Sequence, residues 1–187
     1  MGYFDCEYNA LGRDKAGVLV KCEGSEVIGM LNGPFEPSGG ILNMYSGSVR
    51  VIIMGSSKTR TQYASLQENI ERILMDLIYL RDYPRCVLEI RIFVVSSIEN
   101  ILAAILNTIS VLLINAGIQM KGILLAVHDS AAFSTSAYIY SNTKYQKVLR
   151  VGQPAKEDVA KLADLLERMT YSLKEDYKKD WQIALYK

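Results

Sequence analysis

The most apolar stretch of the chain runs from Ser97 to Gly117, and the interpretation of the neighbouring segments depends on it. Nearly every position from Ile98 to Ala116 is apolar or small, and the large apolar side chains surround a helical wheel. Such a helix is either a membrane span or the central helix of a packed core. We favour the core, because the stretch carries several polar side chains and is short for a bilayer. Gly117 suits the left-handed residue that ends many helices.

The patterns on either side predict the remaining elements. Strands are expected at 16–22, 26–31, 48–54, 87–95 and 122–128, with a short hairpin at 138–140 and 148–150. Two amphipathic helices are expected at 61–81 and 154–177. Because strands and helices do not alternate strictly, the order favours an α+β fold, in which helices pack on one side of a mixed β-sheet.

Length and composition narrow the class of protein. The 187 residues fit one domain over 1–187, with a polar N-terminal arm at 1–15 and a charged tail at 178–187. A net charge of +1 gives no global attraction to nucleic acid, although a local basic patch is compatible with it. Three separated cysteines exclude a CxxC motif and favour a reducing intracellular compartment over a disulfide framework. The N-terminus has no secretory signal pattern.

Patterns that carry chemistry are scarce. The one histidine, His128, stands at the end of an expected strand, and we interpret it as a structural side chain. Without clustered ligands the sequence offers no metal site, and one histidine without a nucleophile at motif spacing disfavours triad chemistry. The turn at 55–59 lies between a strand and a helix, but Ile52 and Ser57 occupy the two glycine positions of a P-loop.

That turn still carries two cations, Lys58 and Arg60, at the start of the helix expected at 61–81. The amide groups at a helix N-terminus attract phosphate, so the turn is a candidate contact for an RNA backbone. A solvated basic turn explains the same residues at least as well.

Four motifs, in order along the chain, resemble RNase PH-type domains. They are Gly24-Ser25 leading into Gly33-Pro34-Phe35-Glu36-Pro37, then Tyr83-Pro84-Arg85, the apolar helix with its Asn-Ala-Gly-Ile-x-Met ending, and the strand at 122–127. The match covers about Cys6 to Ser141 and looks most like a small, domain-only ring subunit of the eukaryotic RNA exosome. The resemblance implies an RNase PH-like fold (ribosomal protein S5 domain 2-like) with a shortened C-terminal part.

The same resemblance implies that the chain is not an enzyme. Active phosphorolytic members bind phosphate at a Gly-Gly-Thr-Arg-like turn before the central helix, and they place an acidic pair after the next strand. Here the two segments read Ser-Ser-Ile-Glu-Asn at 96–100 and Tyr-Ile-Tyr-Ser-Asn-Thr-Lys at 138–144. The first lacks the glycines and the arginine, Glu99 would repel phosphate, and the second has no carboxylate. No catalytic residue, metal or cofactor is therefore expected.

The function implied by the resemblance is structural support of 3′-to-5′ RNA processing and degradation, including rRNA processing. In such a ring six RNase PH-type domains surround a channel, cap proteins sit on top, and single-stranded RNA passes through to a separate nuclease. The implied partners are other ring subunits, cap proteins and RNA, without membrane or DNA, in the nucleus, its nucleolus and the cytoplasm. Lys58, Arg60 and Arg85 are the candidate RNA-binding residues. An active phosphorolytic exoribonuclease and an α+β binding module unrelated to RNA stay open as alternatives.

Overall fold

The structure, a computed structural model, describes residues 4–8, 17–22, 24–37, 44–55, 60–96, 101–130, 133–152 and 159–185. Five strands form one sheet in the order β1-β2-β3-β5-β4: β1 (Phe4–Tyr8), β2 (Gly17–Cys22), β3 (Ser25–Phe35), β4 (Ser48–Gly55) and β5 (Val87–Ser96). A second sheet holds β6 (Ile123–Asp129), β7 (Ser134–Ser141) and β8 (Lys144–Val151). The helices are α1 (Arg60–Leu77), α2 (Ile101–Asn115), α3 (Val159–Leu185) and a short 3₁₀ helix at Leu80–Asp82.

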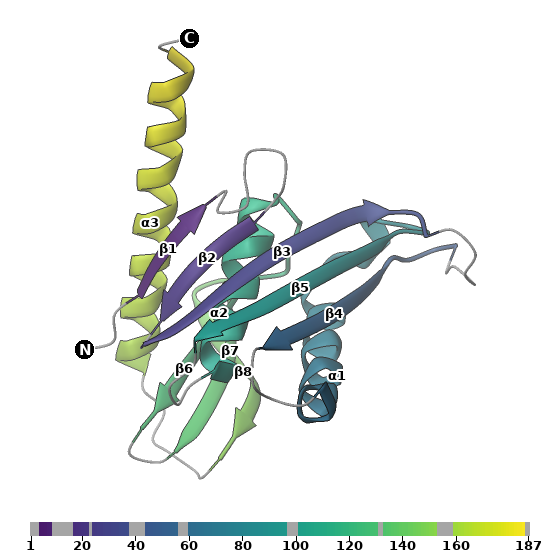
Figure 1. The fold of residues 1–187 in the computed structure, drawn as a ribbon, viewed down its shortest axis with the longest axis horizontal. Coiled ribbons are helices and arrows are strands. Elements are labelled where there is room, and N and C mark those ends of the chain that lie inside the picture. Colours follow the sequence, from purple (N-terminus) through teal and green to yellow (C-terminus); the bar gives the residue numbers. More distant parts are fainter. Residues whose placement is uncertain are drawn as a thin grey trace.

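The five-stranded sheet is mixed, and α1 and α2 lie on the same face of it. β4 runs parallel to β5, whereas the other neighbouring strands are antiparallel. α2 packs against β2 and β3, and α1 packs against β4, so that both helices lie behind the sheet in Figure 1. The α+β fold with helices on one side of a mixed sheet is therefore confirmed.

α2 is the centre of the core. All eleven residues from Ala103 to Leu113 are buried, because the helix contacts β2 and β3 on one side and β6 and β7 on the other. A helix enclosed by two sheets needs apolar side chains all round, which explains its composition. Among the described residues, no helix is both long and apolar enough to cross a bilayer.

The two ends of the chain differ from their sequence expectation. Phe4–Tyr8, expected within an arm, form β1, which pairs with β2 and buries Cys6. α3 continues to Leu185 and takes up most of the segment expected as a charged tail. The sequence has neither proline nor glycine between Val159 and Leu185 to stop it. The strands after α2 also form a sheet of their own, which local patterns do not predict.

Side chains of α1 and α2 form hydrogen bonds with the backbone of one edge strand in each sheet. At the edge strand β4, the Val51 N–H donates to Glu71 Oε1 at 2.8 Å, and Gln67 Nε2 donates to the Val51 carbonyl at 2.8 Å. At the edge strand β6, Asn107 on α2 makes two comparable hydrogen bonds to the backbone of Ala126. Edge strands invite pairing with another chain, and these contacts occupy groups that would otherwise be available.

Candidate functional site

Two of the three basic candidates, Arg60 and Arg85, are separated in the structure by the length of α1. Lys58 and the side chain of Arg60 lie outside the described residues, but the backbone of Arg60 begins α1. Arg85 comes after the opposite end of that helix. Since α1 has 18 residues, its length is about 27 Å, and the two arginines are separated by roughly that distance.

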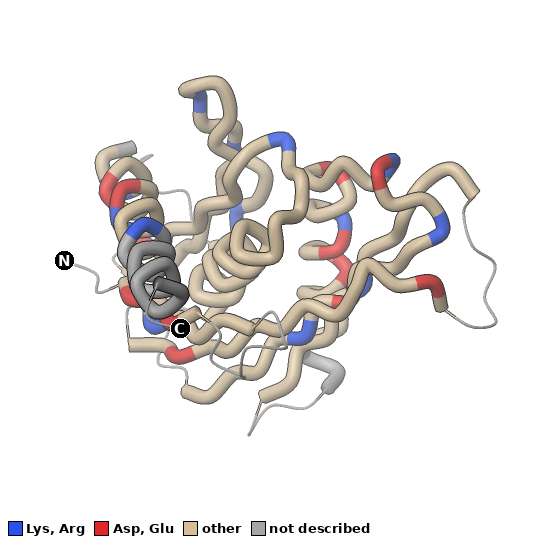
Figure 2. The backbone as a smooth tube through the Cα atoms, turned by 90° about the horizontal axis from the view of Figure 1, so that it is seen from above, with Lys and Arg blue, Asp and Glu red and all other residues tan. Residues whose placement is uncertain are grey.

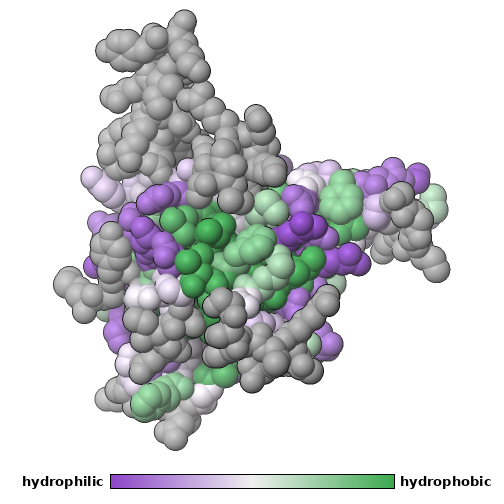
Figure 3. All heavy atoms as spheres, viewed as in Figure 1, coloured by the Kyte–Doolittle hydropathy of each residue, from purple (hydrophilic) through white to green (hydrophobic). Residues whose placement is uncertain are grey.

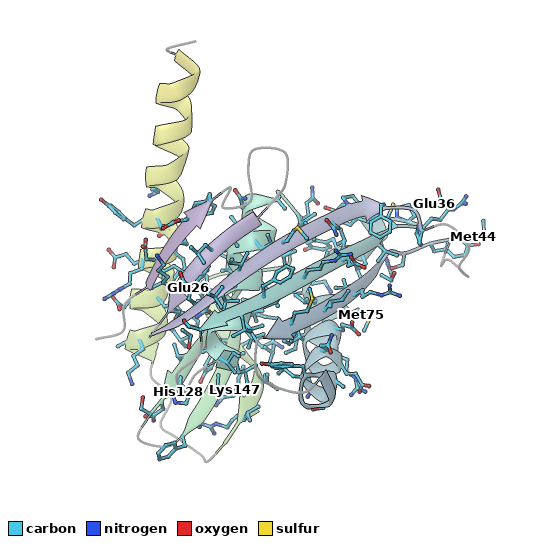
Figure 4. The ribbon with its side chains drawn as sticks, viewed as in Figure 1. Glu26, Glu36, Met44, Met75, His128 and Lys147 are labelled. Atoms are coloured by element: carbon cyan, nitrogen blue, oxygen red, sulfur yellow. The ribbon has the colours of Figure 1, made fainter. Side chains whose placement is uncertain are left out.

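Arg85 is held in place by Glu36, a residue that belongs to another of the four motifs. Its backbone adopts a positive φ of 62°, and its Nη2 lies 2.5 Å from Glu36 Oε1. Glu36 follows the end of β3 at the far end of the sheet, as Figure 4 shows, so that two of the segments that resemble RNase PH-type domains meet here. Both side chains are more than half exposed, so this ion pair adds about 0–1 kcal/mol and leaves the guanidinium accessible to a phosphate.

An exposed aromatic ring and a lysine lie at the same end of α1 as Arg85. The Lys121 ammonium is 6.0 Å from the centre of the Tyr79 ring, and Tyr79 is 47% exposed. Lys121 reaches this position because its N–H donates to the Leu77 carbonyl at the end of α1. Sequence patterns do not reveal the pair, since its members are 42 residues apart on different elements. Cations beside exposed rings are typical of single-strand binding surfaces.

The segment at 138–144 forms a hairpin turn with no acidic side chain. Asn142 and Thr143 both have positive φ, 48° and 63°, which is the backbone of a type I′ turn between β7 and β8. The Tyr140 and Tyr145 rings pack 4.9 Å apart beside it. Residues 97–100, which belong to the segment that stands where active RNase PH-type members bind phosphate, lie outside the described residues.

The described part of the chain holds no group of three or more His, Cys, Asp or Glu residues placed to bind a metal ion. His128 lies in the three-stranded sheet, where Figure 4 labels it, and its Nδ1 is 3.0 Å from Thr135 Oγ1. Acidic and basic positions are interspersed along the backbone in Figure 2, without a continuous basic stripe among the described residues. An RNA contact here would therefore be local.

The fold matches that of Rrp46 from rice (Oryza sativa), an RNase PH-type subunit of the exosome. The TM-score is 0.72, the match covers 91% of this chain and 94% of that chain, and the sequence identity is 16%. The chain has the RNase PH-like fold. No family model matches the chain, and no curated protein matches it in sequence. The RNase PH-like fold is thus established by architecture, and a fold alone does not establish an activity.

The match reaches further than the four motifs. They cover about Cys6 to Ser141, whereas the structural match includes nearly all of the rice chain. β8 and α3 both extend beyond the segments that local patterns predict.

Proposed function

We propose that this chain is a non-catalytic subunit of an exosome-type ring and supports 3′-to-5′ RNA processing and degradation. The observation that carries the proposal is the RNase PH-like fold shared with rice Rrp46 over nearly the whole of both chains. Rings of similar domains close through heterologous contacts, in which each subunit offers two different surfaces. Other RNase PH-type subunits and cap proteins are the partners that such a position requires, and the nucleus and cytoplasm are the compartments in which we place it.

Affinity purification of the tagged full-length chain from its own cells tests this proposal. We expect other RNase PH-type subunits and cap proteins to stay bound in fixed proportions after a second purification step. An untagged strain is the control for background. Recovery of the chain with no ring partner would instead favour a binding module unrelated to RNA.

The proposed non-catalytic role rests on the side chains of two segments, 96–100 and 138–144, which stand where active members bind phosphate and place their acidic pair. Phosphorolysis depends on holding an inorganic phosphate dianion and stabilising charge as the bond breaks. Residues 96–100 offer no glycine pair and no arginine, and Glu99 adds a negative charge. The hairpin at 138–144 offers hydroxyls, an amide and Lys144, but no carboxylate to act as a general acid.

The isolated chain is therefore expected to show no phosphate-dependent RNA degradation. Single-stranded RNA and inorganic phosphate should give no nucleoside diphosphates above a buffer control, because both halves of the phosphorolytic site lack their groups. A reaction without phosphate separates phosphorolysis from contaminating hydrolysis, and a known phosphorolytic enzyme shows that the assay works. Nucleoside diphosphate release that stays with the chain through further purification would identify it as an active exoribonuclease.

For RNA, we propose that Lys58, Arg60 and Arg85 contact the phosphate backbone within the ring channel. Changing all three to alanine should weaken RNA binding by the assembled ring about equally for different sequences. The salt dependence of binding should also become flatter, because fewer counterions are released. Both effects can be measured by titrating labelled single-stranded RNA at several salt concentrations.

A Glu36→Gln variant is the matched control for the RNA experiment, since it removes the charged partner of Arg85 and keeps the arginine. If Arg85 serves only to hold Glu36, this variant will weaken RNA binding as much as a single Arg85→Ala variant does. Unchanged binding by an intact ring with all three substitutions would assign these cations a structural role. Loss of assembly would place at least one of them at a subunit interface.

A further inference from the structure

Three of the four motifs meet at one end of the molecule. Tyr83, in the Tyr-Pro-Arg motif, accepts a hydrogen bond through its hydroxyl from the Gln119 N–H at 3.4 Å. Gln119 belongs to the Asn-Ala-Gly-Ile-x-Met ending of the apolar helix. Arg85 pairs with Glu36 of the Gly-Pro-Phe-Glu-Pro motif. Because the motifs are far apart in the chain, the fold alone gathers them beside the end of α1.

Backbone hydrogen bonds fasten residues 119–121 to the end of α1. The Tyr79 N–H donates to the Gln119 carbonyl at 3.2 Å, and the Lys121 N–H donates to the Leu77 carbonyl at 2.8 Å. The backbone positions that carry the Tyr79 ring and the Lys121 ammonium are therefore fixed before a ligand binds. A site that is already in place pays less entropy on binding.

The Tyr79 ring can be reached by a flat ligand. It is 47% exposed, whereas Tyr63 on the same helix is 6% exposed and belongs to the core. The Lys121 ammonium, on an exposed residue, is 6.0 Å from the centre of the Tyr79 ring. An exposed aromatic ring offers a face on which any nucleobase can stack.

Lys121 and Arg85 differ in their partners. Arg85 is paired with Glu36, whereas no carboxylate in the described part of the chain forms an ion pair with Lys121. The charge of Lys121 can therefore serve a phosphate. The C-terminal end of a helix, such as the end of α1 at Leu77, disfavours anions. The ammonium is thus the group here that is best suited to hold a phosphate.

The surroundings of the site favour a nucleic acid strand over a protein partner. Figure 3 shows that hydrophobic side chains gather over the middle of the sheet, whereas hydrophilic ones predominate at the end that carries Glu36 in Figure 4. An exposed tyrosine suits either kind of partner, but lysine is depleted in protein interfaces. Lysine and an aromatic ring together are typical contacts of a single strand.

We propose that Tyr79 stacks on one base of single-stranded RNA, while Lys121 contacts the phosphate beside that base. This inference rests on the RNA contact proposed above, and it adds a contact to a base where Lys58, Arg60 and Arg85 supply only charge. Because every base has a face on which a ring can stack, the contact carries little sequence preference.

Titration of a labelled, short oligouridylate tests the stacking contact, with the tagged full-length chain and the subunits that stay bound to it. Tyr79→Ala should weaken binding about tenfold, whereas Tyr79→Phe should stay within about twofold of wild type because it keeps the ring. Tyr171→Ala, which removes a tyrosine on α3 that is 66% exposed, is the matched control and should have no effect. Equal unfolding temperatures and equal recovery of subunits will show that the variants are intact.

Two further measurements separate stacking from charge. On an oligomer of the same length without bases, Tyr79→Ala should have no effect, since no base is left to stack. Lys121→Ala should reduce the slope of log affinity against log salt by about 0.7, the value for one phosphate of a single strand. Tyr79→Ala should leave that slope unchanged. Lys174→Ala, at an exposed lysine on α3, is the control for Lys121→Ala.

Several results would overturn the inference. They are a wild-type chain that binds no RNA, unchanged RNA affinity in Tyr79→Ala, and an equal loss of affinity on the oligomer without bases. Loss of subunits from Tyr79→Ala would also overturn it, because Tyr79 would then belong to a protein interface. None of these results contradicts ring membership, which fails if the wild-type chain is recovered without ring partners. In that case the RNA titration of the chain itself still decides the inference.

Discussion

Replacing Ile105 with aspartate is expected to abolish soluble expression of the chain. Ile105 is fully buried in the middle of α2, which two sheets enclose. An unpaired carboxylate placed there loses its hydration and gains no partner, and the cost rivals the entire 5–15 kcal/mol stability of a typical domain. The measurement is the soluble fraction after expression, followed by circular dichroism of any material recovered.

Two controls separate buried charge from other effects of the Ile105 change. Ile105→Val removes one methylene from the same site and should cost about 0.5–1.5 kcal/mol while leaving the fold intact. Met75→Asp adds the same carboxylate at a position that is 46% exposed and should be tolerated. An Ile105→Asp chain that folds as well as wild type would contradict the placement of α2 in the core.

Replacing Asn107 with leucine is expected to destabilise the chain by about 3 kcal/mol or more, although the substitution makes the core more apolar. The buried amide of Asn107 accepts from the Ala126 N–H at 2.8 Å and donates to the Ala126 carbonyl at 2.9 Å. Leucine leaves both backbone groups buried without these bonds, and each unmet group costs about 1–3 kcal/mol. Urea unfolding followed by circular dichroism measures the change in free energy.

Thr108→Val is the matched control for Asn107→Leu. Thr108 is equally buried, but its hydroxyl donates to the Ala104 carbonyl four residues earlier in the same helix, at 2.7 Å. That carbonyl can keep its helical hydrogen bond, so the valine variant should lose less than about 1 kcal/mol. If the two variants lost equal stability, the Asn107 bonds would not be what secures β6 against α2.

Local periodicity in the sequence was enough to predict several helices and strands. The apolar stretch around α2 predicted a core helix, and all residues from Ala103 to Leu113 are buried. The strand expected at 87–95 is β5, and the helix expected at 61–81 is α1 with a 3₁₀ turn after it. Because these patterns repeat every 2 or 3.6 residues, a short window is enough to recognise them. The order of four short motifs then indicated the RNase PH-like fold.

The candidate site was only partly predictable. The sequence singled out Arg85, yet its contact with Glu36 spans 49 residues and depends on the path of β3. Lys121 beside Tyr79 was missed for the same reason. The sequence also grouped Arg85 with Arg60, whereas the length of α1 separates them.

The pairing of segments that are far apart in the chain depends on the three-dimensional fold and could not be predicted from local patterns. β1 is a five-residue strand with a weak sequence pattern. It forms one edge of the sheet because it pairs with β2. Asn107 is an ordinary polar residue in an apolar helix until the fold sets it against the backbone of Ala126. On the face of the five-stranded sheet that is turned away from α1 and α2, four apolar residues, one from each of four strands, lie side by side; they are Leu19, Ile28, Phe93 and Met54. Alternation assigns each residue to a face, but register, which is set between strands far apart in the chain, places the four side by side.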